Sequence, residues 1–157
     1  MSSIRKKILM VLIHQAGLPL LTCFRKPKPW YYSHEELRNL HEGTWGKALA
    51  DTLDRKGYRL LRNYEYHDAK HVLLDYGMDE ISEVKMQFFF LGNRRYSFPV
   101  LSTVTIGFIL MPKRHREFFR EYLKGRRTPP VNRHNIARMM DEPLEQVRQK
   151  LCITKTQ

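Results

Sequence analysis

The stretch Tyr66-His67-Asp68-Ala69-Lys70-His71, with eleven residues between His71 and Glu83, determines how we interpret this chain. His67 and His71 are four residues apart, so a helix places both imidazoles on one face, and Asp68 flanks that face. Two histidines at this spacing also occur by chance on helix surfaces. The carboxylates of Asp68 and Glu83 make a metal site the sharper interpretation, because imidazole and carboxylate ligands together suit zinc, iron or manganese.

The residues around this stretch predict two consecutive helices. The first is expected over residues 62–76 and carries both histidines, and Gly77 is expected to stop it. Asp79 is expected to cap a second helix over residues 79–91. Glu83 then lies near the start of the second helix and can turn back toward the imidazoles.

The rest of the chain also favours helices, and it contains neither alternating strand patterns nor internal repeats. Ser33 and Glu36 form a capping-box pattern, and Thr44 is a second candidate cap. We therefore predict one all-α domain over residues 1–157, a bundle of about six to seven helices. Further segments with helical patterns are residues 3–15, 33–41, 44–57, 96–112, the basic stretch after Pro112, 132–140 and 143–151.

Composition and charge limit the class of protein. The chain has 157 residues, of which 42% are hydrophobic and 28% charged, a balance typical of a folded domain. Cys23 and Cys152 are too few for a disulfide framework, so a reducing compartment fits. The net charge of +12 favours an anionic partner, which is nucleic acid, an acidic membrane surface or an anionic ligand. Residues 113–133 hold eight of the basic residues, so a solvated basic face and contact with anionic lipid are both open.

The spacing His67-Asp68-x-x-His71, with Glu83 after eleven residues, resembles the signature of the ubiquinone (coenzyme Q) biosynthesis protein four family. Gly43-Thr44-Trp45-Gly46 and the C-terminal residues 141–153 resemble two further segments of that family, so the resemblance covers residues 43–153. Residues 1–32 lie before this metal-binding core as an N-terminal helix and loop. Within the motif, Lys70 stands where the family usually has an aromatic residue.

The resemblance implies a helical protein, peripheral to the membrane where ubiquinone is made, that binds a divalent metal and polyprenyl lipid. It also implies a part in the oxidative removal of the ring carboxyl group of the quinone precursor. Carried over by position, the metal ligands are His67, Asp68, His71 and Glu83. We expect Zn²⁺ there, with Fe²⁺ or Mn²⁺ as alternatives.

Residues near the motif are candidates for supporting roles. Four polar residues are close enough in sequence to orient the imidazoles or attract an acidic headgroup: Glu65, Tyr66, Lys70 and Asp75. The second helix is apolar almost all round, which indicates either protein core or the wall of an apolar pocket. With the resemblance, we expect a share in an isoprenoid pocket for Met86, Phe88, Phe89 and Phe90.

Three classes of function remain open from the sequence. The first is a metal-dependent enzyme that decarboxylates a prenylated hydroxybenzoate-type precursor, and the second is a non-catalytic prenyl-lipid-binding or scaffolding subunit. The third, a nucleic-acid-binding protein, is disfavoured because the positive charge is spread over several segments and no base-reading motif is present.

The expected partners follow from the first two classes. They are a prenylated quinone precursor or polyprenyl lipid, an anionic membrane surface, other quinone-biosynthesis proteins and a second copy of the chain. We expect a cytoplasmic location, peripheral to the inner (cytoplasmic) membrane. The uncharged stretch 96–112 is read as a buried or membrane-apposed helix, because prolines bracket it and polar residues dilute it.

Overall fold

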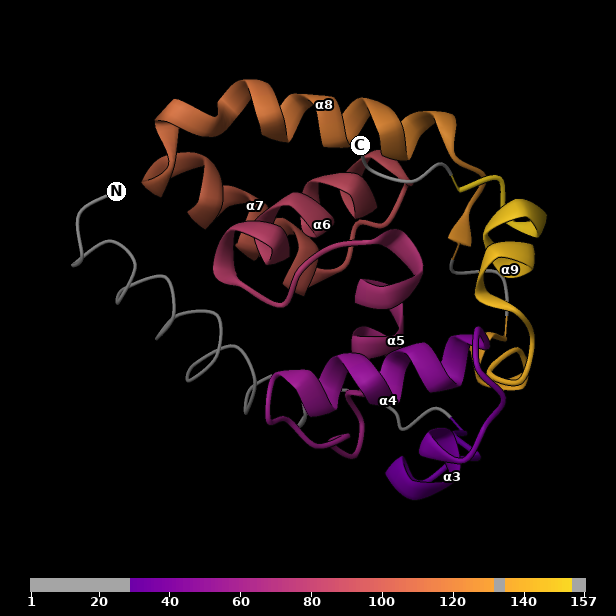
Figure 1. Cartoon of the computed structure of the whole chain (residues 1–157). Helices are drawn as coiled ribbons and strands as arrows, with labels where there is room; N and C mark the ends of the chain where they lie inside the picture. The colour runs from indigo at the N-terminus through magenta and orange to yellow at the C-terminus, as the bar shows by residue number, and fades with distance from the viewer. Residues whose placement is uncertain (1–28, 132–134, 154–157) are drawn as a thin grey trace. The chain divides into compact units, whose positions relative to one another are not determined.

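The computed structural model describes residues 29–131 and 135–153 (Figure 1). These residues form seven α-helices and short 3₁₀ turns, and their β pairing is one isolated bridge between Thr44 and Pro143. The prediction of an all-α fold is therefore confirmed. The predicted helix over residues 3–15 lies outside the described residues.

The described residues divide into two compact units. We call residues 77–130 unit 1, and residues 29–76 with 131 and 135–153 unit 2. The single-domain organisation stays a prediction.

Unit 2 is assembled from helices with clear sequence caps. α3 (His34–Arg38) begins with the predicted capping box, in which the Ser33 hydroxyl and the Glu36 carboxylate each bind the other residue's backbone amide. α4 (Trp45–Arg55) begins at Thr44, whose hydroxyl accepts from the Lys47 amide. The other helices of unit 2 are α5 (Glu65–Leu74), the 3₁₀ helix η4 (Ile136–Arg138) and α9 (Leu144–Lys150), and α4 contacts α3, α5 and α9.

Backbone hydrogen bonds join the beginning of α4 to the C-terminal part of unit 2. The Trp45 amide donates to the Glu142 carbonyl at 2.9 Å, and the Gly46 amide donates to the Met140 carbonyl at 2.7 Å. The Leu144 amide returns a bond of 2.9 Å to the Gly43 carbonyl. The two short segments that resembled the family in sequence, almost a hundred residues apart in the chain, are thus direct neighbours.

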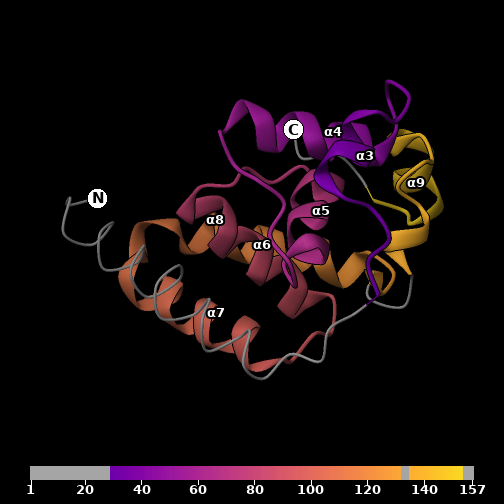
Figure 2. The ribbon, with the colours of Figure 1, turned by 90° about the horizontal axis from the view of Figure 1, so that it is seen from below.

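Unit 1 contains α6 (Glu80–Gly92), α7 (Phe98–Leu110), the 3₁₀ helix η2 (Pro112–Arg114) and α8 (His115–Arg127). α6 packs against both α7 and α8, as two perpendicular views show (Figure 1 and Figure 2). The centre of the packing is a buried cluster of Val84, Phe88, Met111 and Phe118.

Two glycines allow α6 and α8 to touch backbone to backbone. A Cβ atom added at Gly92 would lie 2.0 Å from the Tyr122 carbonyl oxygen, and one added at Gly125 would lie 2.0 Å from the Phe89 carbonyl oxygen. Next to this crossing, the buried Asn93 amide group donates to the Gly125, Thr128 and Pro129 carbonyls at 3.2, 2.9 and 3.0 Å.

One predicted helix end and one predicted helix differ from the structure. α5 ends at Leu74, and its stop is Asp75 in the left-handed conformation with φ 61°, instead of Gly77. Aspartate tolerates this conformation better than most residues, and its amide closes the last turn on the His71 and Val72 carbonyls. The helix predicted over residues 132–140 is, in its described part, only the 3₁₀ turn Ile136–Arg138.

Candidate metal centre

His67 and His71 face each other along α5. Their Nε2 atoms are 3.1 Å apart, and their ring centroids are 4.7 Å apart with the ring planes at 75°. His71 is buried, with 3% of its surface exposed, whereas His67 is half-buried. The pair therefore presents two nitrogen atoms at one point, with one ring at the surface and one inside.

The spacing of the two nitrogens fits a shared metal ion. Two imidazole nitrogens bound to one tetrahedral zinc ion at about 2.0–2.1 Å lie about 3.3 Å from each other. Two neighbouring ligands at right angles at the same bond length lie about 2.9 Å apart. The observed 3.1 Å falls between these two separations, and it is also the length of a hydrogen bond between the two rings.

α5 is held in place within unit 2 by groups that bind its backbone. The indole Nε1 of fully buried Trp45 donates to the Ala69 carbonyl at 3.0 Å. Near the C-terminal end, the buried Arg148 of α9 donates from Nε to the Leu73 carbonyl at 2.9 Å and from Nη2 to the Val72 carbonyl at 2.7 Å. These bonds satisfy carbonyl groups of the last helical turn, and the guanidinium charge complements the negative end of the helix.

Tyr66 anchors the beginning of the same helix. Its hydroxyl lies 3.0 Å from the Pro29 carbonyl oxygen and 3.2 Å from the Asn135 Oδ1, and its ring packs edge to face on Trp30. Burial, with smaller contributions from Tyr31 and Glu65, raises the pKa of the Tyr66 phenol, so the group stays a neutral donor. These contacts give Tyr66 a role in fixing α5.

The other three predicted supporting residues occupy different positions on α5. Glu65 is half-exposed in the first turn, where its negative charge suits the helix N-terminus. Lys70 is buried, with 7% of its surface exposed, and Asp75 is exposed at the C-terminal cap. Their predicted action on the imidazoles stays a prediction.

In unit 1, the cap of α6 fixes the position of Glu83 on its helix. The Asp79 carboxylate accepts from the Ile81 and Ser82 amides at 3.1 Å each and from the Ser82 hydroxyl at 2.6 Å. Partial burial would raise the pKa of Asp79, but the bonds from Ser82 and Ile81 outweigh it and lower the pKa. The predicted cap is confirmed, and it places Glu83 in the first turn of α6.

Glu83 is buried and has a partner that the sequence analysis missed. The Gln87 side-chain amide donates to the Glu83 Oε1 at 2.6 Å, one turn further along α6. Gln87 is itself buried, with 7% of its surface exposed. The spacing of four residues between a glutamate and a glutamine was the signal that could have identified this pair.

Among residues 29–131 and 135–153, three candidate metal ligands offer one ligand atom each: His67 and His71 in unit 2, and Glu83 in unit 1. Asp68, the fourth ligand predicted from the motif, is half-buried on α5 and is outside this set. Two nitrogen donors and one carboxylate oxygen match the donors of known zinc sites that leave a position for a further ligand. The donor set does not identify the metal.

The predicted pocket residues Met86, Phe88, Phe89 and Phe90 are all buried on α6. Phe88 stacks on Phe118 of α8 with centroids 4.7 Å apart and planes at 11°. The Phe88 ring is therefore part of the core cluster of unit 1, which agrees with the interpretation of this helix as protein core. A share of these residues in a lipid pocket stays a prediction.

Comparison with known proteins identifies one family and one similar crystal structure. Residues 54–157 match the family described as coenzyme Q (ubiquinone) biosynthesis protein Coq4. A crystal structure from Nostoc punctiforme, of a protein assigned to ubiquinone biosynthesis, shares the fold with a TM-score of 0.62 and 22% sequence identity. The similarity covers 97% of this chain and 81% of the Nostoc chain. No curated protein matches the sequence. Because the family match includes the histidine motif, Glu83 and about two thirds of the sequence, this chain belongs to the coenzyme Q (ubiquinone) biosynthesis protein Coq4 family.

Proposed function

We propose that this protein, which has a role in ubiquinone biosynthesis through its family, acts on a prenylated quinone precursor with the help of a bound divalent metal. The observation that carries the proposal is the pair of Nε2 atoms of His67 and His71, 3.1 Å apart on a helix fixed at both ends. We assign Glu83 as the carboxylate ligand and Asp68 as a fourth ligand or a support for His67. Zinc is the first choice, with iron or manganese as alternatives.

The residues of the chain have separate tasks in this proposal. His67 and His71 bind through neutral Nε2 atoms, so each ring carries its proton on Nδ1 in the bound state. Gln87 holds one oxygen of the Glu83 carboxylate and so orients the group as a ligand. Trp45 and Arg148 keep α5 from shifting along its axis, which preserves the spacing of the two rings.

A metal held by His67, His71 and Glu83 would supply Lewis-acid chemistry, which would polarise a phenolate or carboxylate oxygen of the substrate ring and stabilise negative charge as carbon dioxide leaves. We propose oxidative decarboxylation of the ring as the reaction. In balanced form, a ring carboxylic acid, dioxygen and a two-electron donor with two protons give a ring hydroxyl group, carbon dioxide and water. Dioxygen is the oxidant, and a partner protein supplies the electrons.

The lipid tail of the precursor explains the proposed location. A polyprenyl chain keeps the precursor in the bilayer, so a protein that acts on the ring works at the membrane surface. We place the protein on the cytoplasmic face of the inner membrane as a peripheral protein. Among the described residues, no helix is both long and apolar enough to cross a bilayer.

The proposal is tested by release of carbon dioxide. Metal-loaded protein is incubated with a prenylated hydroxybenzoate, dioxygen and an electron donor, and carbon dioxide and the ring product are quantified. His71→Ala and Glu83→Gln should abolish turnover, and His71→Ala should also lose stoichiometric metal. The matched control is His41→Ala, which removes an exposed imidazole from the same unit and should retain both.

Two results would redirect the proposal. Tight binding of a polyprenyl lipid without turnover, with oxygen and electrons supplied, would assign the protein as a lipid-binding or scaffolding subunit. Wild-type metal content in both His67→Ala and His71→Ala would reject the metal site itself.

A further inference from the structure

α7 has an apolar face that is not used in the core of unit 1. Four of its large apolar side chains are substantially exposed: Phe98 at 76%, Leu101 at 44%, Phe108 at 52% and Ile109 at 68%. With Thr105, which is also exposed, they fall within an arc of about 100° around the helix, and the buried Val100 and Gly107 lie on the opposite side. We call these four residues the α7 apolar face.

Positive charge lies at both ends of this face. Exposed Arg94 precedes α7, and exposed Lys113 and Arg116 follow it. Residues 87–116 contain no aspartate or glutamate. The next acidic residue, Glu117, is paired with Lys85 at 2.7 Å and with Arg114 at 2.9 Å. The α7 apolar face is therefore uncharged along its length and cationic at its ends.

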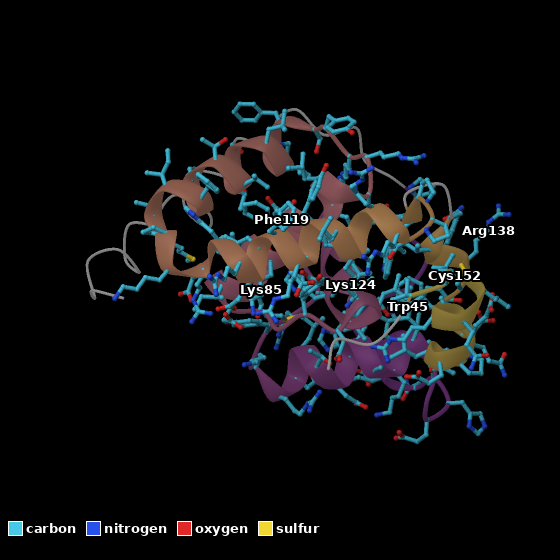
Figure 3. The ribbon with its side chains drawn as sticks, turned by 90° about the horizontal axis from the view of Figure 1, so that it is seen from above. Trp45, Lys85, Phe119, Lys124, Arg138 and Cys152 are labelled. Carbon is cyan, nitrogen blue, oxygen red and sulfur yellow. The ribbon has the colours of Figure 1, made fainter. Side chains whose placement is uncertain are left out.

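α8 also carries exposed basic residues next to an exposed apolar side chain. Its exposed side carries four arginines around one exposed aromatic ring, and Figure 3 shows that ring, Phe119, on the side of the helix away from Lys124. Phe119 is 59% exposed. The arginines are Arg116, Arg120, Arg126 and Arg127. Aromatic and apolar side chains next to arginines are typical of segments that lie at an anionic lipid surface.

A second copy of the chain fits this surface poorly. Two α7 helices paired in parallel would bring Arg94 against Arg94 and Lys113 against Lys113. In antiparallel pairing, Arg94 would face the other copy's Lys113 and Arg116. Either arrangement opposes like charges, which costs binding energy, and Glu117 is already paired with Lys85 and Arg114. Anionic lipid headgroups supply the missing negative charge.

The length of α7 decides how it would meet a bilayer. Thirteen residues make a helix about 20 Å long, shorter than the hydrocarbon core of about 30 Å. An uncharged helix of this length with cationic ends suits the interface, where its apolar side chains enter the acyl region and the basic groups stay among the headgroups.

We propose that the α7 apolar face, with the basic residues at its ends, is the surface by which this protein docks on an anionic bilayer. The choice of partner rests on the proposed function, but the surface uses none of the metal ligands. The contact has two parts, an apolar part from α7 that salt leaves intact and an electrostatic part from the arginines that salt weakens.

The test compares the full chain on vesicles of phosphatidylcholine alone and on vesicles with about one third phosphatidylglycerol. No metal or substrate is added, so a negative result leaves the metal proposal untouched, and a metal-free protein that still binds vesicles supports docking alone. Phe98→Ser with Ile109→Ser should lower partitioning onto the anionic vesicles by about tenfold or more at every salt concentration. Arg116→Gln with Arg120→Gln should lower it mainly at low salt.

The matched control is Tyr58→Ser with Leu61→Ser, which removes two apolar side chains that are 52% and 58% exposed in unit 2. This variant should bind within about twofold of wild type, and circular dichroism checks that all variants are folded. Equal binding by the Phe98/Ile109 and Tyr58/Leu61 variants would overturn the proposal. A wild-type dimer in light scattering that the Phe98/Ile109 variant converts to a monomer would also overturn it, because a second copy would then occupy the face.

Discussion

The guanidinium group of Arg148 holds the carbonyl group of Leu73, 75 residues earlier in the chain, through a buried bond of 2.9 Å. A second bond of 2.7 Å reaches the Val72 carbonyl, so one side chain of α9 closes the end of the helix that carries His67 and His71. Glu145 holds the same guanidinium group at 2.6 Å. The order of α5 thus depends on a residue outside the metal motif.

Arg148→Met should destabilise the protein by about 3 kcal/mol, because the Leu73 carbonyl loses its side-chain donor and the Val72 carbonyl keeps only the Asp75 amide. Urea unfolding followed by circular dichroism measures the loss. Arg126→Met is the control, since Arg126 is exposed on α8, and its effect should stay within about 0.5 kcal/mol. Equal midpoints for the two variants would show that the Arg148 bonds contribute nothing.

A second prediction concerns acid stability and the pair of Arg38 and Asp54. The Arg38 guanidinium donates to both oxygens of Asp54 at 2.8 and 2.7 Å, which lowers the pKa of Asp54 from 3.8 to about 2. A carboxyl group with a lowered pKa stabilises the folded state above its ordinary pKa. That contribution declines as the pH falls below 3.8 and is absent below about 2.

Replacing Arg38 tests this sign. Arg38→Gln should raise the pKa of Asp54 toward 3.8, which a carboxyl titration by NMR measures, and should flatten the acid part of the stability profile. Arg55→Gln is the control, because it removes a positive charge from α4, the helix of Asp54. Arg55 bonds to Asp51 and Thr52 instead of Asp54. A titration of Asp54 that is the same in both variants would contradict the assigned cause.

Local signals predicted the helices well because most of the caps are local. Ser33, Thr44 and Asp79 each bind backbone amides within three residues, so their sequence patterns are sufficient. The end of α5 was misplaced because both Asp75 and Gly77 can adopt a left-handed conformation. The chain uses the first, in which the last turn closes on His71 and Val72.

In the candidate site too, local features could be predicted from the sequence and long-range contacts could not. His67 and His71 could be predicted as a pair because the helix itself brings them together. Trp45 and Arg148 could not be predicted as supports of α5, because their bonds join residues 24 and 75 positions apart and no spacing rule connects them. Asp68 was expected as a ligand from the motif alone, and its role still rests on the motif.

A third prediction concerns the crossing of α6 and α8. Gly92→Ala should cost about 3 kcal/mol, because the new Cβ would lie 2.0 Å from the backbone oxygen of Tyr122 and the two helices would have to separate. Gly57→Ala is the contrast: the site has open space but a φ of 68°, so only backbone strain of about 1 kcal/mol is added. Thermal unfolding of the two variants should therefore rank Gly92→Ala well below Gly57→Ala.

The last prediction tests the metal through stability, without any turnover. A ligand that binds the folded state alone stabilises it by about 2.7 kcal/mol at a free concentration one hundred times its dissociation constant. Zinc or cobalt should therefore raise the unfolding midpoint of the wild-type chain in proportion to the logarithm of metal concentration, and a chelator should reverse the shift.

Variants of the ligands and of their support should respond in a fixed order. Loss of a hydrogen bond that supports a ligand typically weakens metal affinity by about 10- to 100-fold, and removal of one imidazole ligand should weaken it by more than that. His67→Ala and His71→Ala should therefore show almost no shift, and His41→Ala should respond like wild type. Gln87→Met, which keeps Glu83 but removes its 2.6 Å partner, should shift less than wild type and more than either histidine variant. A midpoint that rises equally in all of these proteins would mean that the metal binds elsewhere on the chain.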